Sequence, residues 1–123
     1  MRLMLIAAFA ACLVPATRAA DAEKGKGTFA KCGVCHSVGP DAVNKIGPVL
    51  NGVVGRPLAS APDFNYSQSM KDLAAANPAW TEDLLNRYLE NPRALVPGGK
   101  MAFAGLKKPE DRENVIAYLK TMP

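Results

Sequence analysis

The sequence has few of the side chains that bind metal ions through nitrogen or sulfur. Its 123 residues include a single histidine, His36, and three cysteines, Cys12, Cys32 and Cys35. A zinc site built on Cys32, Cys35 and His36 would need a further ligand. Cys12 is the only candidate left, which argues against zinc. The chain also has no internal repeat and no low-complexity tract, so repeat architectures are excluded.

The sequence contains no basic run with interleaved aromatic residues, the pattern that is typical of nucleic-acid binding. Fifteen Lys and Arg residues against eleven Asp and Glu residues give a net charge of +4. We therefore predict no nucleic-acid partner. With so small a net charge, electrostatic attraction of any partner depends on where the basic side chains lie on the surface.

Long apolar runs are also missing, with one exception near the N-terminus. Residues 3–14 are apolar, but this stretch is too short to span a bilayer comfortably. It follows a positively charged start at Arg2. It precedes Thr17-Arg18-Ala19. Thr17 and Ala19 are small residues at the two positions that matter for cleavage of an exported protein. The pattern indicates a secretory signal.

We predict a signal peptide over residues 1–19, cleaved near Ala19 or Ala20, and a single domain over residues 20–123, at the usual domain size. Cleavage would remove two arginines and lower the net charge to +2. Two alternatives stay open, an uncleaved N-terminal membrane anchor and a lipid attached to Cys12. The signal-peptide interpretation predicts an exported, periplasmic protein.

The most informative motif in the chain is Cys32-Gly33-Val34-Cys35-His36. This C-x-x-C-H spacing is the attachment signature of a c-type haem. Both thiols can bond to the haem edge while the imidazole ligates the iron from one face. A thioredoxin-like redox pair would need a strand before the motif, and a structural disulfide between Cys32 and Cys35 is a further alternative. The adjacent histidine favours haem.

Capping residues and apolar periodicity predict an α-helical chain. We expect helices over residues 21–34 and 65–76, a third from a cap at Thr81 to a stop at Asn91-Pro92, and a last one over residues 109–121. Residues 37–60 show no sustained hydrophobic periodicity. We therefore predict that they form a loop that packs on a large cofactor.

Gly25 lies inside the first predicted helix, where glycine costs about 1 kcal/mol relative to alanine. Close approach of another backbone at this position would explain it. Phe29, four residues later, lies on the same helix face.

A haem iron with His36 on one side needs a second axial ligand, and no other histidine exists. After removal of the signal, the candidates are Met70, Met101 and Met122. Met70 lies in a predicted helix, where core packing explains a methionine, and Met122 is next to the C-terminus. Met101 lies in a loop with glycines on both sides. We therefore predict Met101 as the ligand, with core packing as the alternative.

These motifs together resemble a class I c-type cytochrome, of the mitochondrial cytochrome c and bacterial c2/c550 type. The resemblance covers residues 21–122. It is carried by Glu23-Lys24-Gly25-Lys26, Phe29, the C-x-x-C-H motif, Gly47-Pro48, Gly55-Arg56, Tyr66, Trp80, Tyr88-Leu89-Glu90-Asn91-Pro92, Pro97 to Gly105, and Ile116-Ala117-Tyr118-Leu119-Lys120.

The resemblance implies an all-α fold of four to five helices wrapped around one covalently attached haem c. Its N- and C-terminal helices would cross, with Gly25 near Tyr118. Cys32 and Cys35 would attach the haem, and His36 and Met101 would ligate its iron.

The resemblance also implies roles for residues around the haem. The Pro48 carbonyl would orient the His36 ring. Tyr88 would lie near the sulfur of the methionine ligand. Three further residues would bind a propionate: Arg56, Tyr66 and Trp80.

Two positions depart from the family pattern. Gly99 lies where many relatives have threonine, and Met70 where many have asparagine. The span between Tyr66 and Trp80 is also slightly longer than in mitochondrial relatives. These departures affect the tuning of the reduction potential rather than ligation.

Ligation by histidine and methionine fills both axial positions and raises the potential. We therefore expect that the protein is not an enzyme. We expect a monomeric, periplasmic one-electron carrier that binds its partners transiently. Expected partners are a bc1-type complex, a terminal oxidase, a reaction centre or a dehydrogenase. A peroxidase-like or gas-sensing protein with an open iron, and a tethered module of a larger redox complex, are the alternatives.

Docking would use basic side chains that flank the haem-binding segments, against an acidic partner surface. In relatives the matching positions ring the exposed haem edge. We call these six residues the basic ring: Lys31, Lys45, Arg93, Lys100, Lys107 and Lys108.

Overall fold

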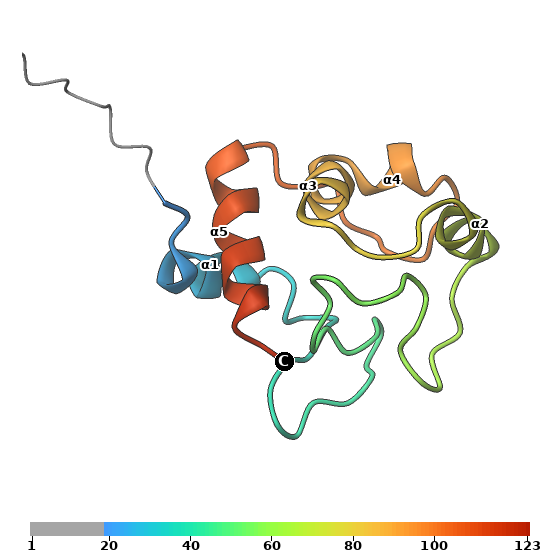
Figure 1. The fold of residues 1–123 in the computed structure, drawn as a ribbon, viewed down its shortest axis with the longest axis horizontal. Coiled ribbons are helices and arrows are strands. Elements are labelled where there is room, and N and C mark those ends of the chain that lie inside the picture. The colour runs from blue at the N-terminus through green and yellow to red at the C-terminus, as the bar shows by residue number, and fades with distance from the viewer. Residues whose placement is uncertain (1–18) are drawn as a thin grey trace, which may run out of the picture.

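The computed structural model describes residues 19–123, so the predicted signal peptide lies outside the described residues except for Ala19. The described chain forms helices joined by long loops and contains no strand, which confirms the all-α expectation (Figure 1). Its five helices are α1 (Ala22–Phe29), α2 (Gln68–Ala76), α3 (Glu82–Glu90), α4 (Pro92–Leu95) and α5 (Pro109–Lys120). No helix within residues 19–123 is long and apolar enough to cross a membrane.

Helix α1 is shorter than the sequence predicted. Asp21 caps it by accepting hydrogen bonds from the amides of Glu23 and Lys24, but the helix ends at Phe29 rather than at residue 34. The chain then continues in tight turns, in which the Cys35 and His36 amides both donate to the Cys32 carbonyl, at 3.0 and 2.9 Å. These turns replace the last helical turn and bring both cysteines and the histidine close together.

The helices α1 and α5 cross and pack against each other (Figure 1). Gly25 is buried at the crossing, where a Cβ atom would lie 1.9 Å from the Asn114 carbonyl oxygen and 2.9 Å from Tyr118 Cβ. The ring centroids of Phe29 and Tyr118 are 5.5 Å apart. The crossing and the close backbone contact at Gly25 are therefore confirmed.

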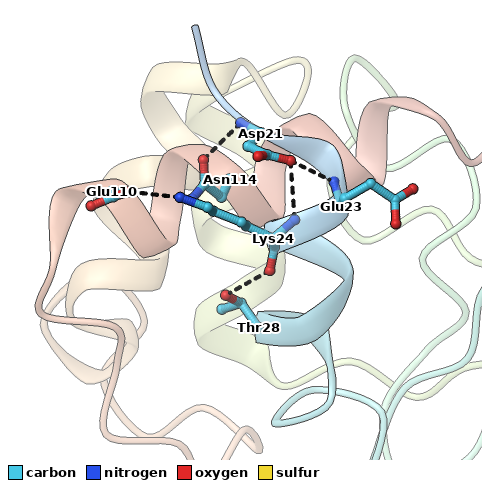
Figure 2. Close-up of polar contacts among 6 residues, drawn as sticks. All are labelled: Asp21, Glu23, Lys24, Thr28, Glu110 and Asn114. Carbon is cyan, nitrogen blue, oxygen red and sulfur yellow. Dashed lines mark hydrogen bonds and ion pairs between the residues drawn. The ribbon is translucent and has the colours of Figure 1, made fainter. Parts of the chain in front are cut away.

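Polar contacts join the N-terminal ends of the same two helices (Figure 2). The Asp21 amide donates to Oδ1 of the buried Asn114 at 2.8 Å. Lys24 and Glu110 form an ion pair at 3.9 Å, but both side chains are exposed. Such a pair contributes less than about 1 kcal/mol, so the orientation of α1 depends mainly on the Asn114 contact and on close packing.

The remaining helix boundaries follow their capping residues. The Thr81 hydroxyl accepts from the Leu84 amide and caps α3, as predicted. Ser67 caps α2, which therefore begins at Gln68 instead of residue 65. The short helix α4 was not predicted. Asn91 caps it and Pro92 occupies its first position, where the missing N–H is no loss, so the pair that ends α3 also begins α4.

The core lies between α3, α5 and the loop of residues 37–60, which has neither helix nor strand, as expected. The loop is tied to the C-terminus, because the Gly52 amide donates to the Met122 carbonyl at 2.7 Å. Buried residues from all three parts, together with Trp80 just before α3, form the core cluster: Val53, Leu58, Trp80, Leu84, Leu85, Ile116 and Leu119.

The helix crossing predicts opposite effects for two glycines of α1. We expect Gly25→Ala to destabilise the protein by about 3 kcal/mol, at the upper end of overpacking effects. Gly27 is exposed, and a Cβ atom on it would meet no other atom within 4 Å, so Gly27→Ala should stabilise by about 0.5–1 kcal/mol. Denaturant unfolding of both variants measures the difference. Similar effects at the two positions would contradict the close crossing.

Candidate functional site

A cavity of about 400 Å³ borders the core and opens to the surface beside Val34 and Ile46. One part of its lining comes from the segment between Phe29 and Arg56, and the other from residues between Ala59 and Phe103, with Val115 and Leu119 contributed by α5. Most of the lining side chains are apolar, and the few polar ones come from well-separated parts of the chain. A mainly apolar cavity with few polar groups is typical of a cofactor site.

The C-x-x-C-H motif lines this cavity with Cys32, Cys35 and His36. Both cysteines are free thiols, so the alternative of a disulfide between them is not supported. Burial raises the pKa of the Cys32 thiol, and the nearby Lys31 partly opposes this. Within residues 19–123 no group of three His, Cys, Asp or Glu side chains could hold a metal ion.

The ring of His36 is held by the loop that follows it. Its Nδ1 lies 2.7 Å from the Pro48 carbonyl oxygen. With the proton on Nδ1, this contact is a donated hydrogen bond, and Nε2 keeps its lone pair for a metal. Burial lowers the pKa of His36, the Pro48 carbonyl opposes this, and Arg56 and Lys45 lower it further. The neutral, metal-ligating form of the imidazole is therefore favoured.

Gly47 provides the space for the imidazole, a role that the sequence did not reveal. A Cβ atom on this residue would lie 2.4 Å from His36 Cε1 and 2.9 Å from Nε2. The Gly47 amide also donates to the Cys35 carbonyl at 2.8 Å. The resemblance to the family includes Gly47-Pro48, but only the folded chain shows that Gly47 packs directly against the ring.

Met101 lines the same cavity from the segment between α4 and α5. The Tyr88 hydroxyl of α3 donates to its Sδ atom at 3.8 Å. Burial raises the pKa of Tyr88 to about 12, so the hydroxyl keeps its proton and remains a donor at neutral pH. Met70 also lines the cavity, whereas Met122 does not line it.

Arg56, Tyr66 and Trp80, for which the resemblance implied propionate binding, all line the cavity. Arg56 Nη1 donates to the Val49 and Asn51 carbonyls at 2.8 and 3.0 Å. Its Nε–H is buried and has no partner among the described residues. A buried guanidinium donor without an acceptor is rare, and a carboxylate in the cavity would satisfy it with a strong charge-assisted bond.

The lining residues fit a haem on four independent observations. The cavity is large and mainly apolar, two free thiols have the attachment spacing, a neutral imidazole is available, and a buried Arg56 N–H lacks an acceptor. A haem propionate would supply the missing acceptor, and the two thiols would be available for covalent attachment. The arrangement therefore defines an all-α protein with a covalently attached haem.

Comparisons with known proteins agree with this class. The family model for cytochrome c matches residues 22–123, and the chain belongs to the cytochrome c family. Members of this family carry a covalently attached c-type haem and act as electron carriers, and Cys32 and Cys35 have the required spacing.

Individual relatives match most of the chain. Cytochrome c2 from Rhodomicrobium vannielii is 48% identical over 124 residues, covering 98% of this chain and 97% of the relative. Cytochrome c from Euglena viridis is 47% identical over 103 residues, covering 83% and 97%. The structure of cytochrome c2 from Rhodospirillum centenum has a TM-score of 0.78 at 38% identity, covering 83% of this chain and 98% of that one.

The structure thus brings all four residues of the predicted site to one cavity, Cys32, Cys35, His36 and Met101. Their individual roles in attachment and ligation stay predictions.

Proposed function

We propose that this chain is a periplasmic one-electron carrier whose haem iron is ligated by His36 and Met101. The observation that carries the proposal is that Met101 lines the same cavity as His36, and that its Sδ atom accepts a hydrogen bond from the Tyr88 hydroxyl. The relatives named cytochrome c2 support it.

When bound, the haem supplies an iron that alternates between the ferric and ferrous states. The chain's own residues hold it in place. Cys32 and Cys35 would form the thioether bonds, the Pro48 carbonyl fixes the orientation of His36, and the Arg56 Nε–H would donate to a propionate. An axial methionine raises the reduction potential, and the apolar lining keeps water away from the iron.

Closure of both axial positions favours electron transfer over catalysis. A substrate could reach the iron only by displacing Met101. We therefore propose no catalytic residue. An open-iron peroxidase or gas sensor would require a second axial position that no side chain occupies, whereas here Met101 lines the same cavity as His36.

Replacement of Met101 tests the ligand assignment. Met101→Ala should remove the weak far-red sulfur-to-iron band of the ferric protein and let the ferrous protein bind carbon monoxide. The reduction potential should fall by on the order of 0.1 V, since axial ligands set potentials over about 0.8 V. Optical spectra with and without carbon monoxide, and a redox titration, measure these changes.

Met70→Ala is the matched control, because Met70 lines the same cavity from α2. It should keep the far-red band and exclude carbon monoxide. If wild-type protein lacked the band or bound carbon monoxide rapidly, the carrier proposal would fail and a catalytic or sensing role would be favoured.

The basic ring is the proposed docking surface. All six of its residues are exposed, and Lys31 and Lys100 also line the cavity. Two large apolar side chains that line the cavity, Val34 and Ile46, are 71% and 76% exposed. Apolar contacts surrounded by positive charge would suit a transient complex with an acidic surface.

Fitting partners are membrane complexes and dehydrogenases with acidic surfaces at their redox centres. These include a bc1-type complex, a terminal oxidase and a reaction centre. We propose that the protein binds them one at a time as a monomer, with charge increasing the rate of encounter.

Charge reversal within the basic ring tests the docking proposal. Lys31→Glu should slow oxidation of the ferrous protein by ferricyanide by about tenfold or more at low salt. A change of two unit charges about 10 Å from this trivalent anion costs about 2.5 kcal/mol in water before screening. Added salt should abolish the difference by screening. Stopped-flow rates measure it.

Lys71→Glu provides the control, because this lysine of α2 is exposed and does not line the cavity. Equal slowing in both variants would show that net charge, rather than the basic ring, controls the rate.

We propose that residues 1–19 are a signal peptide removed on export. Expression in a bacterium that assembles c-type cytochromes should yield a haem-loaded periplasmic protein. N-terminal sequencing should find Ala20 first, since the small residues at positions 17 and 19 suit the peptidase. Retention of the full chain in the membrane fraction would favour the anchor alternative.

A further inference from the structure

Arg112 of α5 is a buried cation with only neutral partners. The residue is 6% exposed. Its Nε donates to Asn86 Oδ1 at 2.8 Å, and its Nη1 donates to the Leu106 and Lys107 carbonyls at 2.7 and 3.0 Å. Neither ion pair within residues 19–123 includes it. Burial of an unpaired charge is costly, so the contacts that it makes need an explanation.

Both backbone acceptors of Arg112 belong to the segment that carries Met101. This segment, residues 96–108, connects α4 to α5, and we call residues 105–107 its stem. The stem is held on its other side by α3, because the Leu106 amide donates to the Leu89 carbonyl at 2.7 Å. The Lys107 ammonium donates to the Glu90 carbonyl at 2.9 Å. Arg112 therefore joins the stem to both α3, through Asn86, and α5.

Only a few contacts hold the part of the segment around Met101. The Lys100 ammonium donates to the Asn65 carbonyl, and the Lys107 ammonium donates to the Ala104 carbonyl at 3.1 Å, both at exposed positions. Among the described residues, no backbone–backbone hydrogen bond outside the helices involves residues 100–105. The Tyr88 contact with the sulfur, at 3.8 Å, is weak. Residues 97–100 are exposed. Because the Lys100 contact comes from an exposed lysine side chain, the position of Met101 depends mainly on the stem that follows it.

We propose that Arg112 is a positioning residue for Met101. Its guanidinium holds the stem between α3 and α5, and this keeps the Met101 sulfur at the cavity. The part concerning iron ligation rests on the proposed function, whereas the part concerning the stem stands on the hydrogen bonds alone.

Arginine suits this position better than lysine. The planar guanidinium presents five donors in a fixed geometry, so it reaches a side-chain amide and two carbonyls together. A lysine ammonium is a compact and strongly hydrated charge, and it would lose either the Asn86 contact or the carbonyl contacts. A neutral acceptor set also leaves no acidic group that could draw the cation away from the stem.

The experiment compares the haem-loaded protein with its Arg112→Lys and Asn86→Ala variants. The first readout is hydrogen exchange of the Leu106 amide, which bonds to Leu89 across the stem. The second is the rate at which imidazole binds the ferric iron. We expect both to rise about tenfold or more, the effect of losing one hydrogen bond to a charged group.

The control is Ile116→Val or Ile116→Ala, whichever matches the lowered denaturant midpoint of Arg112→Lys. Ile116 is buried in the core cluster on the same helix and does not line the cavity. It should leave Leu106 exchange and imidazole binding close to those of the wild type. Equal acceleration in this control would show that Arg112 contributes only to global stability, and would overturn the proposal.

Asn86→Ala keeps the experiment decisive if Arg112→Lys does not fold, because it removes one acceptor and leaves Arg112 in place. Unchanged Leu106 exchange in Asn86→Ala would then overturn the proposal. Faster exchange without faster imidazole binding would overturn the positioning of Met101. A wild-type spectrum without the sulfur-to-iron band would count against the proposed function, while Leu106 exchange would still test the stem.

Discussion

The close crossing of α1 and α5 at Gly25 is the constraint on which both parts of the haem cavity depend. Helix α1 leads directly into the turns that carry the C-x-x-C-H motif, and α5 carries Arg112, which holds the end of the Met101 segment. Because two packed helices are locked at one point, the motif and the segment are placed by close packing rather than by the loops between them. A side chain at position 25 would disturb both.

The loop of residues 37–60 shows how a segment without helix or strand becomes part of a defined site. A chain of this size can bury only a modest core, and here the core borders a cavity. Individual hydrogen bonds hold the loop around it, among them a reciprocal pair between Asn51 and Gly39 and the bonds from Arg56 to Val49 and Asn51. Each bond satisfies a backbone group that no regular element could.

The polar groups of the cavity are held in one protonation state. Burial favours neutral His36 and keeps the proton on Tyr88, while a guanidinium such as Arg56 stays charged. Because the protonation states, the orientation of the His36 ring and the apolar lining are all fixed, the structure of the site should change little when an electron arrives. This rigidity agrees with the electron-carrier role of the cytochrome c family.

The sequence by itself determined the cofactor, the helical class and most of the site. The C-x-x-C-H spacing is local, and the capping of α3 depends on Thr81 and its neighbours, so neither required the fold. Only the tertiary structure decided that α1 ends at Phe29, that Gly47 packs on the His36 ring, and that Arg112 holds the Met101 segment. Each of these results from contacts between residues that packing brings together, and local patterns contain no information on such contacts.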